Sequence, residues 1–148
     1  IVRDDVPVIP GLDGRKMSKS YNNHIPMFLA EKKLRKMIMK ITTDSRPPED
    51  PKEPIGTIID LYKSFATGAE LRELCDWYDR GIGWGEAKQV LFEKINEHMG
   101  PKREIYEELM ANTEEIDKVL KEGTEKIRPK AIKLLSEIKG AIGVNLRS

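Results

Sequence analysis

In several segments from residue 34 onward, apolar side chains recur at every third or fourth position, which is the period of amphipathic α-helices. No stretch after Phe28 alternates with the period of two that half-buried strands show. The pattern therefore predicts five or six amphipathic helices, packed as an all-helical bundle. The apolar stripes are Leu34, Met37, Ile38, Ile41; Ile55, Ile58, Ile59, Tyr62; Leu71, Leu74, Cys75, Tyr78; Ala87, Val90, Leu91, Ile95; Ile116, Val119, Leu120; and Ile127, Ala131, Leu134, Leu135, Ile138.

Two polar pairs predict helix starts. Glu70 follows Thr67 at the spacing of a capping box, and Glu115 follows Asn112 at the same spacing. In such a box the first side chain accepts a hydrogen bond from a backbone N–H of the first turn, which has no partner inside the helix. We therefore expect one helix to begin just after Thr67 and another just after Asn112.

Glycines and prolines predict where helices end. Glycines 81, 83 and 85 are expected to stop the helix before them, and Gly123 to end the segment after Asn112. Four prolines between residues 47 and 54 break the chain between two helices. Pro101 is expected to kink or divide the helix that contains it, whereas Pro129 is tolerated if it falls in the first turn of the last helix.

The first 27 residues lack helical periodicity. Val6 to Ile9 is a short apolar stretch that can end a strand, and Gly11 and Gly14 then mark a flexible loop that runs to Ser20. The sequence thus predicts a mainly α fold. A strand and a loop occupy residues 1–27, and a helical bundle occupies residues 28–148.

Composition narrows the class of protein. A length of 148 residues corresponds to about one domain, and a hydrophobic fraction of 39% can build one core. No apolar run approaches the roughly 20 residues that span a bilayer, and no signal peptide opens the sequence. We therefore expect a cytoplasmic protein with no membrane partner. Because the sequence begins at Ile1 rather than at methionine, we also expect it to be a piece of something longer.

Cysteine and histidine give no sign of disulfide or metal chemistry. Cys75 is the only cysteine, and the two histidines, His24 and His98, are far apart in the sequence. Cys75 and His98 both fall on helical apolar stripes, so we expect them to serve packing or capping rather than catalysis. No metal site is predicted.

The net charge of +1 conceals a basic front segment. Residues 11–40 hold eight lysines or arginines against two acids, whereas residues 41–60 hold two against five. A basic segment of this kind suits phosphate, either of a nucleotide or of a nucleic acid. For the cluster from Lys32 to Lys36, a solvated helix face is the plainer interpretation.

The sharpest chemical signal is the pentapeptide Lys16-Met17-Ser18-Lys19-Ser20, which follows a segment with two glycines. Two ammonium groups three residues apart on a glycine-hinged loop can close over a polyphosphate, and the two serines add hydroxyl donors. A mobile loop lets those charges arrive late, so that they stabilise the transition state more than the bound nucleotide.

The pentapeptide matches the signature loop of class I aminoacyl-tRNA synthetases, and its surroundings from Val8 to Asn23 resemble bacterial tryptophanyl-tRNA synthetases. Three downstream segments, Met39–Ser45, Leu61–Phe65 and Trp84–Lys88, continue the resemblance in the family's order, so that it covers essentially all of the chain. The resemblance implies that residues 1–27 are the last strand and signature loop of a Rossmann-type nucleotide-binding domain. Residues 28–148 would be the helical anticodon-binding domain.

The resemblance also implies a two-step reaction. Tryptophan and MgATP give tryptophanyl-adenylate and pyrophosphate, and the tryptophanyl group then passes to tRNA(Trp). Lys16 and Lys19 would be the catalytic residues, because they would stabilise the leaving pyrophosphate, and Lys19 would contribute more. The nucleotide-binding residues would be Val8, through its backbone, and Met17, Ser18 and Ser20. ATP and Mg²⁺ are the implied cofactors, and the full-length enzyme would be a homodimer.

The family's other signature, a His-x-Gly-His loop, has no counterpart around either histidine, and the tryptophan pocket belongs to that same absent half. We therefore expect the chain alone to form no aminoacyl-adenylate. Two alternatives remain open: a piece of a tyrosyl-tRNA synthetase, and a stand-alone helical RNA-binding module without catalytic activity.

The sequence leaves the residues that contact tRNA undecided. The cluster Lys126, Arg128, Lys130 and Lys133 fits either tRNA phosphates or a solvated helix face. Trp77 and Trp84 are expected to pack or to stand in turns rather than to stack on bases. Asp44 is a natural cap or hinge residue.

Overall fold

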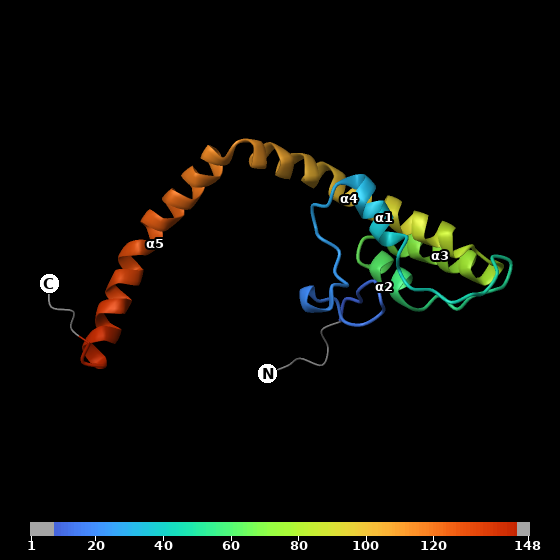
Figure 1. The fold of residues 1–148 in the computed structure, drawn as a ribbon, viewed down its shortest axis with the longest axis horizontal. Helices are drawn as coiled ribbons and strands as arrows, with labels where there is room; N and C mark the ends of the chain where they lie inside the picture. Colours follow the sequence, from blue (N-terminus) through green and yellow to red (C-terminus); the bar gives the residue numbers. More distant parts are fainter. Residues whose placement is uncertain (1–7, 145–148) are drawn as a thin grey trace. The chain divides into compact units, whose positions relative to one another are not determined.

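The computed structural model describes residues 8–144 (Figure 1). Within this range the chain forms five α-helices and one short 3₁₀ helix, and no strand. The predicted mainly α fold is therefore confirmed. The elements are η1 (Lys19–Tyr21), α1 (Glu31–Ile38), α2 (Thr57–Lys63), α3 (Gly68–Arg80), α4 (Trp84–Ala111) and α5 (Thr113–Ala141).

The strand predicted over residues 6–9 falls partly outside the described residues, and Val8 and Ile9 do not belong to a strand. An isolated antiparallel bridge joins Pro10 to Lys16, and the N–H of Met17 donates to the carbonyl of Ile9 at 2.9 Å. A strand needs a continuous partner for its backbone groups. Residues 8–144 offer this segment only the turn that follows it.

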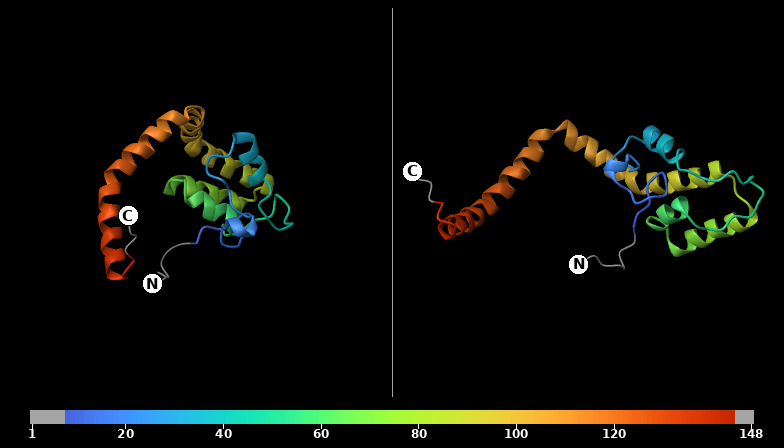
Figure 2. Two further views of the ribbon diagram at one scale, coloured as in Figure 1. Left: turned by 60° about the vertical axis from the view of Figure 1, so that its left-hand side comes forward. Right: turned by 60° about the horizontal axis from the view of Figure 1, so that its bottom comes forward.

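The chain divides into two compact units after Glu104. In the first unit, α1, α2, α3 and the first part of α4 surround one hydrophobic core, and Figure 2 shows α3 beside α4. The predicted apolar stripes supply most of this core, because their helical spacing turns one face of each helix inward. Its buried apolar residues are Leu34, Ile38, Ile41, Ile58, Ile59, Leu61, Tyr62, Leu74, Tyr78, Ile82, Ala87, Leu91, Phe92, Ile95 and Met99.

The capping box at the start of α3 is confirmed. The backbone N–H of Thr67 donates to the Glu70 carboxylate at 2.7 Å, and the N–H of Glu70 donates to the Thr67 hydroxyl at 3.4 Å. The predicted glycine stop after α3 is also confirmed. Gly81 has a φ of +94°, and a Cβ there would meet the backbone carbonyls of Pro48 and Glu49. Only glycine therefore fits this turn without strain.

The helix predicted to begin just after Asn112 is confirmed, because α5 begins at Thr113, but the predicted cap is wrong, since the Asn112 side chain makes no capping hydrogen bond. The stop predicted at Gly123 is also wrong. Gly123 does not end a helix, because α5 continues through it with no positive φ. Pro129 accordingly lies inside α5 rather than in a first turn. Pro101 lies inside α4 and does not divide it, and the alternative, a kink at Pro101, stays a prediction. No side chain of α5 is buried, and apart from the half-buried Ile116 its apolar stripe is exposed.

His98 also differs from its predicted role, because its side chain is exposed. Its ring meets that of Phe65 edge-on at 5.6 Å between centroids. The side chain of Cys75 is half-buried on the apolar face of α3, which agrees with packing.

Candidate functional site

A tight turn begins the basic front segment. The N–H of Gly14 donates to the carbonyl of Gly11 at 3.0 Å, and the N–H of Gly11 donates to the carbonyl of Arg15 at 2.7 Å. Gly14 has a φ of +80°, which glycine adopts without the steric cost that a Cβ brings. The turn reverses the chain directly before Lys16. We call residues 11–23 the lysine loop.

Asn23 closes the lysine loop from inside. Its side chain is only 3% exposed, and its Oδ1 accepts the N–H of Ser18 at 2.8 Å. Its Nδ2 donates to Asp13 Oδ1 at 2.7 Å and to the carbonyl of Lys16 at 3.2 Å. One amide therefore holds three points of the loop.

The predicted catalytic lysines both point away from the core. Lys16 follows the turn and Lys19 begins η1, and both side chains are exposed. Ser18 caps η1: its hydroxyl accepts the N–H of Ser20 at 3.3 Å, and the two hydroxyl oxygens lie 2.8 Å apart. The structure thus brings both lysines and both serines onto one short segment.

The two apolar residues predicted to bind nucleotide lie in different surroundings. The side chain of Met17 packs against the hydrophobic core, so only its backbone faces the loop. The side chain of Val8, at the beginning of the described residues, is 60% exposed. The Met17 side chain therefore lies apart from the exposed ammonium groups of its neighbours Lys16 and Lys19.

Asp13 is the only carboxylate of the lysine loop, and it is fully engaged. The Asn23 amide, with help from Arg15, holds the pKa of Asp13 at about 2, below its ordinary 3.8. The Arg15 guanidinium lies 2.6 Å from the carboxylate and 4.8 Å from the centroid of the Tyr21 ring. Because Asp13 is ionised and paired with Arg15, the positive charge of Lys16 and Lys19 has no acidic partner within the loop.

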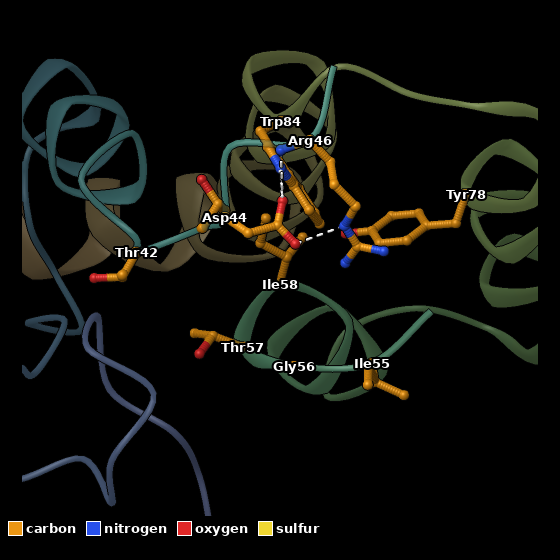
Figure 3. A pocket seen from close by; sticks show the side chains of 10 residues that line it. Thr42, Asp44, Arg46, Ile55, Gly56, Thr57, Ile58, Tyr78 and Trp84 are labelled. Carbon is orange, nitrogen blue, oxygen red and sulfur yellow. Dashed lines mark hydrogen bonds and ion pairs between the residues drawn. The ribbon is translucent and has the colours of Figure 1, made fainter. Parts of the chain in front are cut away.

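A second polar feature lies in the loop after α1 (Figure 3). Asp44 Oδ1 accepts the indole N–H of Trp84 at 2.8 Å, and Oδ2 accepts Nε of Arg46 at 2.6 Å. The backbone N–H of Arg46 and then its side chain, together with Trp84, lower the pKa of Asp44 below its ordinary value. Asp44 thus ties its loop to the start of α4.

A pocket of about 160 Å³ lies beside this carboxylate. Its walls come from the loop of residues 42–46, from residues 55–58 at the start of α2, and from Tyr78 and Trp84, as Figure 3 shows. The Tyr78 hydroxyl is buried without a hydrogen-bond partner in the described part of the chain, and burial raises its pKa above the ordinary value.

Lys52 holds the proline-rich segment together through hydrogen bonds to its carbonyl groups. Its side chain is 2% exposed, and its ammonium group donates to the carbonyls of Pro47, Pro48 and Asp50 at 2.8, 3.2 and 2.8 Å. The same ammonium lies 5.5 Å from the centroid of the Trp84 ring. Buried lysines are rare unless their donors are satisfied, as they are here.

The two loops are joined through one backbone residue. The N–H of Leu12 donates to the carbonyl of Asn23 at 2.9 Å, and the carbonyl of Leu12 accepts the N–H of Thr42 at 3.0 Å. The lysine loop is thereby connected to the loop that carries Asp44.

The described residues hold no group of three or more histidine, cysteine, aspartate or glutamate side chains arranged for a metal ion. Within the same range, no helix combines the length and the apolar composition that crossing a membrane requires.

Sequence reasoning missed the interactions that hold the site. The sequence marks Asp44 only as a cap or hinge residue and assigns Asn23 no role. The partners of Asn23 lie across turns, and Trp84 lies 40 residues from Asp44 in the sequence. The burial of Lys52 has no signal in a segment as polar as residues 46–54.

Comparison with known proteins places these features in a family. The family model for tRNA synthetases class I (W and Y) matches residues 5–133. The chain is 42% identical over 146 residues to a tryptophan–tRNA ligase of Xanthomonas axonopodis, and 40% identical over 144 residues to one of Neisseria meningitidis. These matches cover 97% of this chain but 34% and 43% of the two relatives.

A solved structure agrees in fold. The tryptophanyl-tRNA synthetase of Campylobacter jejuni, complexed with ADP and tryptophan, superposes with a TM-score of 0.88 at 37% identity. The match covers 97% of this chain and 46% of that one, so the chain spans less than half the length of the relatives it matches. By the extent of the model match and the agreement in fold, this chain belongs to the class I tRNA synthetase family of the W and Y type.

Proposed function

We propose that the protein carrying this chain is a tryptophan–tRNA ligase. It activates tryptophan with ATP and then transfers the tryptophanyl group to tRNA(Trp). The observation that carries the proposal is the lysine loop, in which Asn23 holds a turn that leaves Lys16 and Lys19 exposed without an acidic partner in the loop. The names of the relatives, at about 40% identity along nearly the whole chain, support tryptophan as the amino acid.

In the activation step, a carboxylate oxygen of tryptophan bonds to the α-phosphorus of ATP, and the bond from that phosphorus to the bridging oxygen breaks. Pyrophosphate leaves with the additional negative charge. The ammonium groups of Lys16 and Lys19 stabilise this charge, and Lys19 has the larger role because it begins η1, next to the paired hydroxyls of Ser18 and Ser20.

The remaining nucleotide contacts come from backbone and hydroxyl groups. Ser18 and Ser20 offer hydroxyl donors to phosphate oxygens. Because the Met17 side chain packs against the core, Met17 contributes its backbone, as does Val8 beside the adenine. In the transfer step, a ribose hydroxyl oxygen of the 3′-terminal nucleotide of tRNA attacks the carbonyl carbon of the adenylate. The bond from this carbon to the phosphate oxygen breaks, AMP leaves, and its phosphate takes up the hydroxyl proton.

The lysine loop does not itself fit a Mg²⁺ ion. Divalent magnesium takes oxygen ligands, and the only carboxylate of the loop, Asp13, already accepts hydrogen bonds from Asn23 and Arg15. The ion would therefore enter as the MgATP complex, held by phosphate oxygens. The residues of this loop supply donors rather than metal ligands, namely the ammonium groups of Lys16 and Lys19 and the hydroxyls of Ser18 and Ser20.

We assign the two functions, nucleotide binding and tRNA binding, to two consecutive parts of the sequence. Residues 1–27 form the end of the nucleotide-binding domain, and residues 28–148 form the helical part that binds the anticodon region of tRNA. We place the full-length enzyme in the cytoplasm as a homodimer, as the family resemblance implies.

The test is ATP–pyrophosphate exchange by the full-length gene product, with tryptophan and tyrosine offered separately. Exchange with tryptophan alone supports the proposal. Exchange with tyrosine alone supports the second candidate, tyrosyl-tRNA synthetase, which the W and Y family model also covers. Exchange with neither leaves the non-catalytic RNA-binding module. Residues 1–148 by themselves are expected to give no exchange.

A further inference from the structure

The side chain of Asn23 makes three hydrogen bonds within the lysine loop. Its side chain is almost fully buried and reaches backward to residues 13, 16 and 18, five to ten positions earlier in the chain. We propose that Asn23 is a positioning residue for the activation step, which fixes Lys16 and Lys19 relative to each other. This inference rests on the proposed function.

The chemistry of the three contacts requires a side-chain amide. The Ser18 N–H is a donor, so it needs an oxygen, whereas the Lys16 carbonyl and the Asp13 carboxylate are acceptors and need N–H groups. Aspartate would offer no donor and would face Asp13 with a second carboxylate. Serine or alanine could not reach all three partners. Asparagine meets the three demands at once.

Two of the three contacts hold the backbone at Lys16 and directly before Lys19. The hydrogen bond from Asn23 Nδ2 holds the Lys16 carbonyl directly, and this fixes the backbone from which the Lys16 side chain projects. The Ser18 N–H is fixed at the N-cap of η1, the short helix that begins with Lys19. One buried side chain therefore holds the backbone between the two lysines. Displacing catalytic groups by about 1 Å commonly costs on the order of 100-fold in rate.

Gly11 supplies an independent way to disturb the same amide. A Cβ at Gly11 would collide with Cγ and Nδ2 of Asn23 and with its carbonyl oxygen. Gly11→Ala is therefore expected to displace Asn23 without changing any donor or acceptor. Asn22 provides the matched control: it lies next to Asn23, has a φ of +53°, and its side chain is exposed.

The experiment is steady-state ATP–pyrophosphate exchange by the full-length gene product. In Asn23→Ala, Asn23→Asp and Gly11→Ala, kcat/KM for ATP is expected to fall about 10- to 100-fold, with KM for tryptophan unchanged. Asn22→Gly, which keeps the left-handed backbone, is expected to stay within about twofold of wild type. Equal activity in Asn23→Asp and wild type overturns the proposal.

A double-mutant cycle separates positioning from mere folding. If Asn23 acts through the lysines, Asn23→Asp is expected to lower kcat/KM for ATP far less in a Lys16→Ala, Lys19→Ala background than in wild type. A purely structural role would multiply the two losses. Multiplied losses, or a matching rise in KM for tryptophan, therefore overturn the proposal.

Amide hydrogen exchange on the same protein keeps the test independent of the proposed function. In Asn23→Ala, amide hydrogen exchange in the Lys16–Ser18 segment is expected to rise about tenfold, while α4 stays protected. In Asn23→Asp the rise should be smaller, because aspartate retains the acceptor for the Ser18 N–H. If the wild-type protein catalyses no ATP–pyrophosphate exchange, the proposed ligase function is rejected. Unchanged protection of this segment in Asn23→Ala rejects the role of Asn23.

Discussion

The indole N–H of Trp84 donates a hydrogen bond of 2.8 Å to Oδ1 of Asp44, which lies 40 residues earlier in the sequence. The first residue of α4 thereby fixes a loop that has no regular structure of its own. The same ring meets Tyr78 edge-on, with 5.8 Å between the centroids, so a hydrogen bond and an aromatic contact hold Trp84 from two sides.

Trp84→Phe is expected to keep the aromatic contact but lose the hydrogen bond to Asp44. The free energy of unfolding should fall by about 1 kcal/mol, because Asp44 is half-exposed and water can replace the lost donor. Thermal unfolding measures this. The matched control is Trp77→Phe, since the indole N–H of Trp77 has no partner among residues 8–144. If adding Asp44→Ala to Trp84→Phe costs as much as Asp44→Ala alone, the hydrogen bond has no measurable weight.

The ion pair between Glu70 and Lys94 predicts a pH dependence of stability. The Lys94 ammonium at 2.6 Å, and then the N–H and hydroxyl of Thr67, hold the pKa of Glu70 at about 2, below its ordinary 4.5. The unfolded chain therefore takes up the proton first as the pH falls. The contribution to stability is complete above the unfolded pKa and is lost as the pH falls toward the folded value.

Glu70→Gln should accordingly lower Tm at neutral pH, and its difference from wild type should shrink between about pH 5 and pH 2. Thermal unfolding across this range measures the difference. Glu73→Gln removes a carboxylate from the same helix without touching Lys94 and serves as the matched control. A difference between Glu70→Gln and wild type that stays constant with pH would contradict the role of the ion pair.

Lys19→Ala is expected to lower kcat for tryptophan-dependent pyrophosphate exchange about 10²- to 10³-fold, because one cationic donor to the leaving group is lost. Lys16→Ala should cost less. KM for tryptophan should not change in either variant, since the lysines act on the phosphate end. Lys33→Ala, an exposed lysine of α1, is the control and should match wild type. A loss in Lys33→Ala as large as in Lys19→Ala would point to a general effect of charge.

The exposed lysines of α5 offer a test of tRNA binding. Lys126, Lys130 and Lys133 recur at i, i+4 and i+7 and therefore share one face. If this face tracks tRNA phosphates, replacing all three by glutamine should flatten the plot of log K against log salt by about two units. Lys118 and Lys121 lie on another face and provide the control. An unchanged slope in the triple variant would identify a solvated face.

The helices around the core could be predicted from the sequence, because burial imposes a period on their apolar residues. The Thr67–Glu70 box and the stop at Gly81 could be predicted too, since both are local. Gly123 misled the prediction for a physical reason. Glycine ends a helix when it takes a left-handed backbone, and within a helix it costs only about 1 kcal/mol relative to alanine. Gly123 keeps a negative φ, so α5 continues.

The candidate site could be predicted in its chemistry but not in its support. Lys16 and Lys19 stand in a short linear motif, which a sequence displays directly. Asn23 contacts Lys16 across a turn, and Trp84 reaches Asp44 from the start of α4, so both contacts exist only after folding. Lys52 is further from expectation, because a lysine surrounded by prolines and acids is ordinarily exposed.

The double role of the Leu12 backbone limits how the lysine loop can move. Its N–H and carbonyl are both occupied, one by Asn23 and the other by Thr42. The hydrogen bond between Leu12 and Asn23 therefore closes the loop at its two ends, and the second hydrogen bond of Leu12 connects it to the segment that leads to Asp44. A displacement confined to residues 13–22 leaves both hydrogen bonds of the Leu12 backbone in place. Any larger displacement must pull Thr42 along or break its hydrogen bond, which makes the amide of Thr42 a natural reporter of loop closure.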